Sequence, residues 1–387
     1  MKAEEVNKAN RALRNRMLSL SSPGAWEKTQ SLTQASLEIA LKDKALSRVK
    51  TVFLIGHGTS YATAMNGECY FSRIARVCAR ALPAYHFLHY MRDFLIAPNE
   101  TLVIGVSCSG NTASVARCLE AAAARGALTL CVSGEKTGGC ANAAQYRIVT
   151  DAHIEYATNV SAYTVSHLFL LLGLYRLAVA LGEAGGALSR REAEGWLEGF
   201  EETQKALSAL PALLTRMEEV CEGLENACPV QNIAVLGTGP NRGTVKEGAL
   251  KISEFCWMFC AEEELEDFAH GRFRELNAST PLFILSPGVE TLQKTKDLLA
   301  GCDKSQTPSV VFTSEADAAV RKLSAFVVDM PPLPHEYLTP FLYVFPLWFY
   351  GYHYRSGRGG LVGEKRYGLL ATDVDYASHF DAGGNRV

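Results

Sequence analysis

A chain of 387 residues exceeds one typical domain and suits two, each able to bury its own core. Its hydrophobic fraction of 48% and charged fraction of 20% are those of a soluble globular protein. A formal net charge of −3 provides no basic footprint for nucleic acid or for an anionic membrane. We therefore expect small molecules and further copies of the same chain as partners.

The eleven cysteines are scattered along the chain, and none forms a CxxC pair of the zinc-binding type. Cys256 and Cys260 are spaced CxxxC and are expected to face a core. This pattern predicts reduced thiols, no metal site and a cytoplasmic location. The start of the chain has no apolar signal core, and the most apolar stretch, 163–182, is broken by His167 and Arg176. Neither is expected to enter a membrane.

Taken in order, the chain is predicted to form five segments. Residues 1–47 are expected to be helices without chemistry, followed by a first α/β domain at 48–183. A helical, charged segment at 184–229 is expected to connect it to a second α/β domain at 230–360. Residues 361–387 are expected to form a C-terminal tail.

The two domains are predicted to be copies of each other. An apolar run ending in glycines lies at 52–58 and returns at 233–239, an offset of 181 residues. Such a run is typical of a buried parallel strand that enters a βα turn. Two further strand-like runs repeat at offsets of 180 and 181 residues. Because strands alternate with helices, each copy is expected to be a parallel doubly wound sheet flanked by helices, with ligands beyond the strands' carboxyl ends.

A dinucleotide site is the first alternative for such a fold, and the sequence argues against it. The motif Gly56-His57-Gly58 lacks a third glycine, and Gly237-Thr238-Gly239 has its next glycine only at 243. No acidic residue ends the following strand to hold a ribose. We expect no cofactor.

Hydroxyl side chains gather at the ends of two strands of the first copy. They are Thr59, Ser60, Ser107, Ser109 and Thr112. The helix after the second strand is expected to start at about Asn111, so its N-terminal amides would add to the hydroxyls. N-capping explains one Ser or Thr at each turn, but not five at two strand ends. The first copy is therefore predicted to bind a phosphate dianion, while the second copy, with Ser286-Pro287-Gly288 there, is expected to lack the cluster.

The second copy carries charges instead. On a helix over 245–256, an apolar stripe would face the core while Glu247, Lys251 and Glu254 share the opposite face. His270 follows sixteen residues after Glu254. Two acids, a lysine and a histidine suit acid–base chemistry, and a solvated helix face is the alternative. One copy is thus predicted to hold phosphate and the other to supply acid and base.

Together these motifs resemble a known family. Gly-Thr-Ser-Tyr at 58–61, Ser-x-Ser-Gly-x-Thr at 107–112 and Glu-Gly-Ala-Leu-Lys-x-x-Glu at 247–254 resemble the tandem sugar isomerase (SIS) domains of glutamine-dependent glucosamine-6-phosphate synthase. The resemblance covers about residues 48–370. The segment 1–47 is too short for that enzyme's glutaminase half, so we do not expect glucosamine synthesis from glutamine.

A closer resemblance is to fructosamine-6-phosphate deglycases, which split 6-phosphorylated fructosamines into glucose 6-phosphate and a free amine or amino acid. It rests on Lys246-Glu247-Gly248, Glu254-Phe255-x-Trp257, the aromatic helix 340–354 and the tail motif 364–367. The resemblance implies that Glu254 is the general base and His270 the general acid. It also implies a homodimer in which the histidine comes from the neighbouring subunit, so that sites lie at the interface.

Other residues have roles that stay open. Lys251, retained from the synthase pattern, would steady an enolate oxygen or simply pair with Glu247. Four residues are considered as possible substrate contacts: Gly58, Glu247, Arg366 and Tyr367. His57 is left out of the acid–base set, and Glu155 is a further candidate contact before a helix.

Three functions compete with the deglycase. The same acid–base pair would support a phosphosugar aldose–ketose isomerase, or a glucosamine-6-phosphate-type isomerase or deaminase without a glutaminase. A non-catalytic sugar-phosphate sensor is the third alternative, and the acidic charge and the absence of a basic N-terminal domain speak against it.

Overall fold

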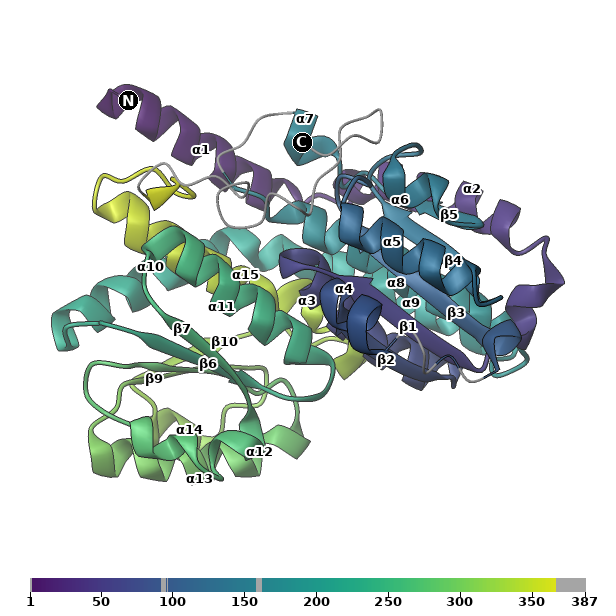
Figure 1. Ribbon diagram of the computed structural model, residues 1–387. Coiled ribbons are helices and arrows are strands. Elements are labelled where there is room, and N and C mark those ends of the chain that lie inside the picture. Colours follow the sequence, from purple (N-terminus) through teal and green to yellow (C-terminus); the bar gives the residue numbers. More distant parts are fainter. Residues whose placement is uncertain (1, 92–94, 96, 158–161, 367–387) are drawn as a thin grey trace. The chain divides into compact units, whose positions relative to one another are not determined.

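The computed structural model describes residues 2–91, 95, 97–157 and 162–366. The chain folds into two structural units. The first unit is Pro23–Glu201, and the second unit joins the chain up to Ser22 with Glu202–Arg366. Each unit contains one five-stranded sheet (Figure 1).

The sheet of the first unit has the order β2-β1-β3-β4-β5, and all its strands are parallel. Its strands are β1 (Thr51–Gly56), β2 (Cys78–Pro83), β3 (Thr101–Ser107), β4 (Leu128–Ser133) and β5 (Tyr146–Val149). Every residue of the central strand β3 is buried, as expected for a parallel strand covered on both faces. The order is that of the flavodoxin-like doubly wound fold, in which the strand order reverses between β1 and β3.

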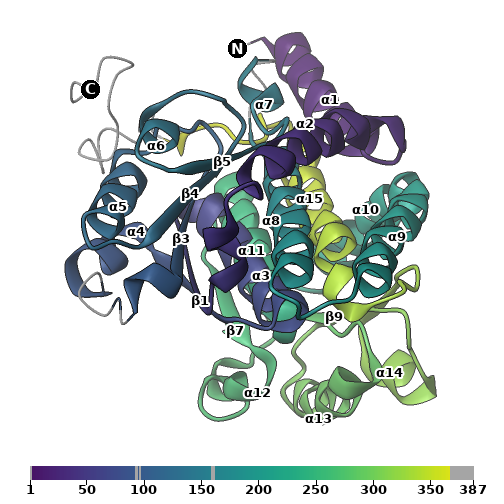
Figure 2. The same ribbon diagram turned by 90° about the vertical axis from the view of Figure 1, so that its right-hand side faces the viewer.

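Helices cover both faces of this sheet (Figure 2). They are α2 (Gly24–Ala40), α3 (Gly58–Tyr70), α4 (Ala84–His86), α5 (Ala113–Ala123), α6 (Gly139–Asn142), α7 (Ile154–Ala157) and α8 (Val165–Ala184), while α9 (Arg190–Ala206) runs from the first unit into the second. Helices α3 and α8 pack side by side on one face. On the other face, side chains of α5 such as Val115 and Leu119 pack on Val103 of β3.

Helix α8 is the one helix in the described part of the chain that is long and apolar enough to cross a membrane. Its mean hydropathy is 1.7, and 89% of the apolar window is buried inside the structure, as in the core helix of a globular protein. His167, which interrupts the apolar stretch, is fully buried and its Nδ1 lies 2.8 Å from Thr63 Oγ1 of α3. The Nδ1 atom of this buried histidine thus has a hydrogen-bond partner within the core.

The second unit repeats the topology of the first. Its strands are β6 (Ile233–Gly237), β7 (Cys260–Glu264), β8 (Leu282–Leu285), β9 (Ser309–Thr313) and β10 (Phe326–Asp329). They are parallel in the order β10-β9-β8-β6-β7, which is the first sheet's order with each strand replaced by its counterpart. The predicted pair of parallel, doubly wound sheets is confirmed.

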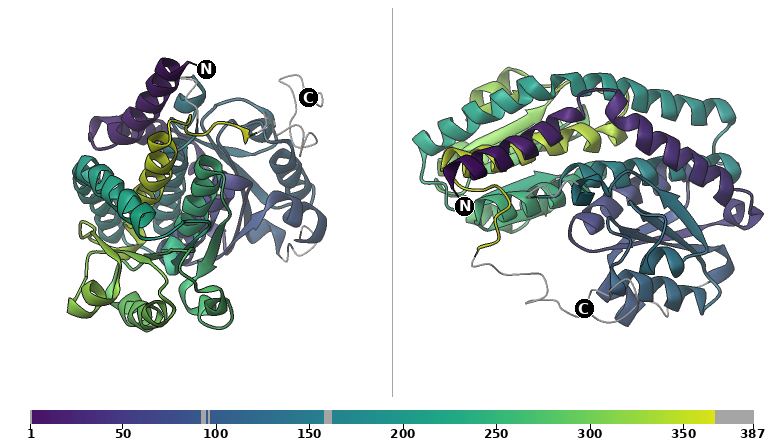
Figure 3. Two further views of the ribbon diagram at one scale, coloured as in Figure 1. Left: turned by 90° about the vertical axis from the view of Figure 1, so that its left-hand side faces the viewer. Right: turned by 90° about the horizontal axis from the view of Figure 1, so that it is seen from above.

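Two layers of helices enclose the second sheet. They are α1 (Ala3–Ser19), α10 (Leu210–Ala227), α11 (Arg242–Cys256), α12 (Leu265–Phe268), α13 (Val289–Ser305), α14 (Ala318–Leu323) and α15 (Pro340–Gly357). Helices α10, α11 and α15 cover one face, and α12, α13 and α14 cover the other (Figure 1). Helix α1 packs along α15 (Figure 3). Short 3₁₀ or π turns complete the fold: η1 (Lys44–Arg48), η2 (Phe71–Ala75), η3 (Phe87–Met91), η5 (Pro98–Glu100), η6 (Leu207–Ala209), η7 (Gly239–Asn241), η8 (Arg272–Glu275) and η9 (Glu336–Leu338).

The aromatic helix α15 belongs to the core of the second unit. Phe345, Trp348 and Tyr350 are fully buried, and the Tyr350 ring meets Phe283 of β8 edge-on at 4.8 Å between centroids. Gly248 of α11 allows close packing here, because a Cβ at that position would lie 2.0 Å from Leu347 Cδ1. The helix that carries the charged residues is therefore seated directly on α15.

Glu155 has a structural place in the first unit. It is fully buried, and its carboxylate accepts hydrogen bonds of 2.8 to 3.1 Å from the backbone N–H groups of Thr164, Val165 and Ser166 and from the Thr164 hydroxyl. These groups form the N-terminus of α8, which a negative charge stabilises. The hypothesis that Glu155 contacts substrate is therefore wrong.

We predict that Glu155→Gln lowers the free energy of unfolding by about 2 to 3 kcal/mol, because one amide oxygen replaces a carboxylate that satisfies several buried donors. Urea denaturation measures the change. Glu192→Gln is the control, since the Glu192 carboxylate likewise accepts from Ser189 N–H but is exposed. Equal stability of the two variants would contradict the proposed role of Glu155.

Candidate active site

Two loops lie at the switch point of the first sheet, which is the place where the strand order reverses. Strands β1 and β3 are neighbours in parallel register, so the turn 56–60 and the loop 107–112 leave the sheet at the same edge. Helix α3 begins at Gly58, and α5 begins at Ala113, two residues later than expected. Two helix N-termini therefore follow the two loops, which is the usual place of an anion in this fold.

The loop 107–112, called here the hydroxyl loop, contains three of the five predicted hydroxyls. Ser107 Oγ and Thr112 Oγ1 lie 2.9 Å apart, and Ser109 Oγ accepts a 3.2 Å hydrogen bond from the N–H of Asn111. Ser107 is buried, whereas Ser109 and Thr112 are partly exposed. The structure thus brings these three side chains together within one tight loop.

The neighbouring turn carries the other two hydroxyls, Thr59 and Ser60, both half-buried in the first turn of α3. Gly56 makes this turn possible, since a Cβ there would lie 2.7 Å from the Ser60 backbone. Gly58 adopts a left-handed φ of 49° and is exposed. Its place at the start of α3 suits the substrate contact predicted for it.

His57 is a site residue that the sequence argument left aside. Its Nε2 lies 2.9 Å from Ser114 Oγ in the first turn of α5. The imidazole therefore links the start of α3 to the start of α5 across the switch point. The only signal in the sequence was its place between two glycines at the end of an apolar strand.

The second sheet keeps part of the hydroxyl pattern at its own switch point, contrary to expectation. Ser286 Oγ and Thr291 Oγ1 lie 3.0 Å apart, like Ser107 and Thr112, and Thr295 donates to Ser286 at 3.1 Å. All three are buried and bonded to one another. The segment Ser286-Pro287-Gly288 has no hydroxyl at the position of Ser109, where Gly288 stands instead.

The charged residues of α11 form a compact cluster, called here the α11 cluster. Lys251 Nζ lies 2.9 Å from Glu254 Oε2 and 3.8 Å from Glu247 Oε1. The side chains of Glu247 and Lys251 are 0% and 4% exposed, while that of Glu254 is 44% exposed. The alternative of a solvated helix face is therefore wrong for two of the three residues. The buried lysine holds the one carboxylate that faces solvent.

The end of α11 is covered by the chain after α15. The indole N–H of Trp257 donates to the Glu364 carbonyl at 3.0 Å, and the guanidinium carbons of Arg355 and Arg366 lie 3.8 and 5.5 Å from its ring centroid. This arrangement places Arg366 beside a residue three positions after Glu254. Tyr367, the other tail residue considered as a contact, lies outside the described residues.

His270 occupies a different part of the second unit. It follows α12, is well exposed, and its Nε2 lies 3.2 Å from Glu266 Oε1. Lys294 of α13 also pairs with Glu266 at 2.6 Å, and together Lys294 and His270 hold the pKa of the Glu266 carboxyl below its ordinary value.

The structure shows no direct contact between the two residues expected to act as acid and base, among the interactions of the described residues. Helix α12 covers one face of the second sheet and α11 the other (Figure 1). Among the described residues, His270 forms no hydrogen bond or ion pair with the α11 cluster.

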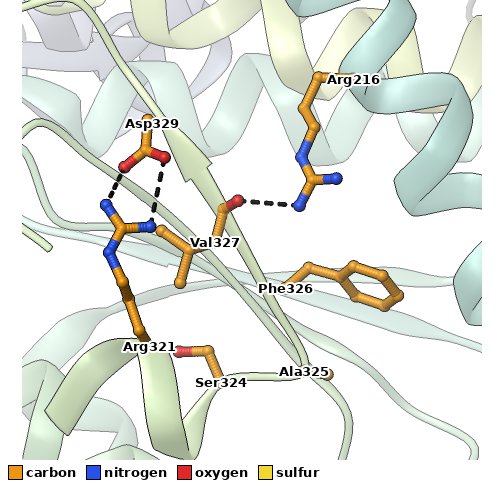
Figure 4. Close-up of a pocket in the computed structure, with 7 residues that line it drawn as sticks. All are labelled: Arg216, Arg321, Ser324, Ala325, Phe326, Val327 and Asp329. Carbon is orange, nitrogen blue, oxygen red and sulfur yellow. Dashed lines mark hydrogen bonds and ion pairs between the residues drawn. The ribbon is translucent and has the colours of Figure 1, made fainter. Parts of the chain in front are cut away.

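A pocket of about 290 Å³ lies at the edge strand β10 and contains none of the predicted site residues (Figure 4). Arg216 of α10 donates to the Val327 carbonyl at 3.1 Å, and Arg321 pairs with Asp329 through two hydrogen bonds. Charged side chains over an exposed strand edge discourage pairing with another strand. We therefore interpret the charged side chains of this pocket as a feature that keeps the edge strand β10 from pairing with another strand.

Within the part of the chain that the structure describes, no group of three or more His, Cys, Asp or Glu side chains could hold a metal ion. None of the eleven cysteines, all of which are described, is part of a disulfide. The chemistry available to the site is thus that of hydroxyls, backbone amides, carboxylates, a lysine and histidines.

The structure defines a duplicated, parallel doubly wound α/β protein with hydroxyl side chains at the switch points of its sheets, and the comparisons with known proteins specify the family. Residues 45–174 match the model of the SIS domain family. This stretch is a SIS domain, so the predicted resemblance to SIS domains is confirmed, whereas the closer resemblance to fructosamine-6-phosphate deglycases stays a prediction.

Relatives extend the similarity over the second unit. The chain is 26% identical over 324 residues to glutamine–fructose-6-phosphate aminotransferase (isomerizing) of Thermococcus kodakarensis, covering 83% of this chain and 50% of the relative. The enzyme of that name from Clostridium perfringens is 24% identical over 94% of this chain and 57% of its own length. The chain thus spans about half the length of these relatives.

Solved structures share the fold. The C-terminal domain of glucosamine-fructose-6-phosphate aminotransferase from Francisella tularensis superposes with a TM-score of 0.73 at 18% identity, covering 93% of this chain and 97% of that one. Tagatose-6-phosphate ketose/aldose isomerase from Escherichia coli gives a TM-score of 0.67 at 18% identity, with 95% of each chain covered. Both likenesses run through the two sheets and establish the tandem architecture.

The α11 cluster predicts a stability effect. Lys251→Met is expected to lower the free energy of unfolding by about 3 kcal/mol, because it removes the positive charge beside the buried Glu247 carboxylate. Adding Glu247→Gln to this variant should recover much of the loss. Chemical denaturation of both variants measures the coupling.

Lys246→Met is the matched control on the same helix, since Lys246 pairs with Glu262 in a more exposed setting. That pair is expected to contribute about 1 kcal/mol or less. A loss for Lys251→Met no larger than for Lys246→Met would show that the α11 cluster is not a buried charge network.

Proposed function

We propose that this chain is an enzyme that splits 6-phosphorylated fructosamines, including fructosyl-amino acid 6-phosphates, into glucose 6-phosphate and the free amine or amino acid. The observation that carries the proposal is the α11 cluster. It presents one carboxylate, Glu254, to solvent and holds it with a buried lysine. A fixed, accessible carboxylate is what proton abstraction from a sugar carbon requires.

Binding of the phosphate is assigned to the first unit. All five hydroxyls lie within residues 45–174, the stretch that matches the SIS domain family. The relatives and solved structures described above carry fructose 6-phosphate or tagatose 6-phosphate in their names. Hydroxyls and helix N-terminal amides suit a phosphoryl group without any lysine.

The reaction follows from the acidity of the substrate. When the sugar ring is open, the C2 carbonyl makes the C1–H acidic, and Glu254 removes that proton to form an enaminol. Protonation at C2 then leaves an imine between C1 and the amine nitrogen. Water adds to C1 and the C–N bond breaks, giving the aldose phosphate and the amine. Substrate and one water balance the two products, so no cofactor is required.

Lys251 has two tasks in this scheme. Its contact with Glu254 orients that carboxylate as a base, and its positive charge stabilises negative charge that develops on the C2 oxygen. Glu247 balances the lysine within the core and acts on the substrate only through it. Arg366, next to Trp257, is proposed to contact the amine portion of the substrate.

His270 is proposed as the general acid, supplied to Glu254 by a second copy of the chain. One observation supports this: the His270 side chain is 71% exposed and is therefore accessible to a second copy. An imidazole is suited to deliver a proton near neutral pH. The proposal therefore includes a homodimer, and a cytoplasmic location where phosphorylated sugars are formed.

A phosphosugar aldose–ketose isomerase, or an isomerase or deaminase of the glucosamine-6-phosphate type, is the second candidate. The specific observation in its favour is the shared fold with tagatose-6-phosphate ketose/aldose isomerase over 95% of the chain. It uses the same base and differs by whether the substrate carries an amine at C1.

An end-point assay separates these functions. The protein is incubated with 6-phosphofructosyl-amino acids and, separately, with fructose 6-phosphate, and glucose 6-phosphate and free amine are measured. Equal amounts of both products are expected from the first substrates. Glu254→Gln should lower kcat by about 10²- to 10⁴-fold, while the control Glu262→Gln stays near wild type. Glucose 6-phosphate from fructose 6-phosphate alone would instead establish the isomerase.

Mixing two inactive variants tests the role of His270. If the histidine acts on the neighbouring copy, Glu254→Gln and His270→Ala subunits together regain about a quarter of wild-type activity, since mixed dimers contain one intact site. Each variant alone stays inactive. No recovery after subunit exchange, shown by mass spectrometry of the mixed dimer, would place both residues' actions within one chain.

A further inference from the structure

The hydroxyl loop is held from one side by residues 134–140, called here the brace, which run from the end of β4 into the first turn of α6. Three loop carbonyls accept hydrogen bonds from it. The N–H of Gly134 donates to Cys108 O at 3.1 Å, the N–H of Cys140 donates to Gly110 O at 2.9 Å, and the Cys140 thiol donates to Thr112 O at 3.3 Å. Alternate carbonyls along the loop thus point toward the brace.

Peptide geometry then fixes the direction of the loop's amides. In a planar trans peptide the N–H points away from the C=O of the same unit. Because the carbonyls of Cys108 and Thr112 face the brace, the N–H groups of Ser109 and Ala113 face the opposite side. The Ala113 amide belongs to the first turn of α5 and has no helical partner by geometry. Two amides at the two ends of the hydroxyl loop thus face the side opposite the brace, where they can donate to an anion.

The brace fits the loop closely at Gly138, which adopts a φ of 128°. A Cβ at this position would lie 2.7 Å from Asn111 Oδ1 and 2.8 Å from the Gly110 carbonyl. Asn111 Oδ1 also accepts a 3.1 Å hydrogen bond from the N–H of Gly139. Any larger residue at 138 would push the brace off the loop.

We propose that Gly138 and Cys140 are positioning residues for phosphate recognition, because they turn the amides of the hydroxyl loop toward the phosphoryl group of the substrate. This inference rests on the proposed function, in which the hydroxyl loop binds that group. Neither residue needs to touch the substrate, since both act through the loop carbonyls. Loss of the brace frees these peptides to rotate and weakens binding of the phosphate specifically.

The test compares matched variants for binding of fructose 6-phosphate by isothermal titration calorimetry, with fructose as the unphosphorylated probe. Gly138→Ala is paired with Gly126→Ala, since Gly126 also has a positive φ, 82°, but a Cβ there would meet no atom within 4 Å. Cys140→Ala is paired with Cys118→Ala, which removes a buried thiol of the same core cluster that donates at 3.2 Å to Ala84 O and not to a loop carbonyl. Cys140→Ser keeps a donor and serves as the conservative rescue.

Gly138→Ala is expected to weaken fructose 6-phosphate binding by about tenfold to a hundredfold, and Cys140→Ala by a smaller factor, because a thiol is a weak donor. Cys140→Ser should bind fructose 6-phosphate with an affinity near that of the wild type. For Gly138→Ala and Cys140→Ala, turnover of a phosphorylated substrate should show a raised KM. Melting temperatures show whether each variant and its control are equally stable.

Binding by both brace variants equal to that of their controls would overturn the inference and leave the proposed function intact. Should Gly138→Ala fail to fold, the comparison of Cys140→Ala with Cys118→Ala decides in the same way. No binding of any sugar phosphate by the wild-type protein would overturn the proposed function and this inference with it.

Discussion

Parallel strand pairing is the constraint on which the site depends. It puts the carboxyl ends of β1 and β3 at one edge, and the reversal of strand order between them leaves room for two loops and two helix N-termini. Once that edge exists, short side chains are enough to make an anion site, because backbone amides supply most of the donors. The hydroxyl loop needs only to be held in one conformation, which its neighbouring segment does through backbone contacts.

The two copies show how one topology can serve two purposes. At the first switch point Ser107 and Thr112 form a pair that is partly open, and at the second Ser286 and Thr291 form the same pair sealed in the interior. The second unit instead places its charged side chains on α11, where Lys251 is buried between two carboxylates. The burial of that lysine is costly unless its partners stay in place, so the cluster is rigid by necessity.

Much of the fold could be read from the sequence, because buried parallel strands are continuous apolar runs and the repeat at 181 residues aligned them in pairs. The shared face of Glu247, Lys251 and Glu254 also followed from helical spacing. The burial of Glu247 and Lys251 could not be predicted from this spacing, since it depends on which helices pack over α11. Likewise Glu155 resembled a loop residue near a ligand, and its five hydrogen bonds to the start of α8 exist only in three dimensions. Helix α12, which precedes His270, and helix α11, which carries Glu254, cover opposite faces of the second sheet (Figure 1), and residue spacing along the chain does not encode this.

Gly248 links the position of the charged residues of α11 to the packing of the core helix α15. A Cβ at Gly248 would clash with Leu347, so the close contact between α11 and the aromatic helix α15 depends on this glycine. The packing against α15 therefore fixes the position of α11 relative to the sheet. Buried residues of α15 thereby help to set the position of Glu254, the proposed base. If that proposal holds, directed evolution of specificity should gain from changes in the loops at the sheet edges, whereas changes within α15 would move the proposed base and reduce turnover for every substrate alike.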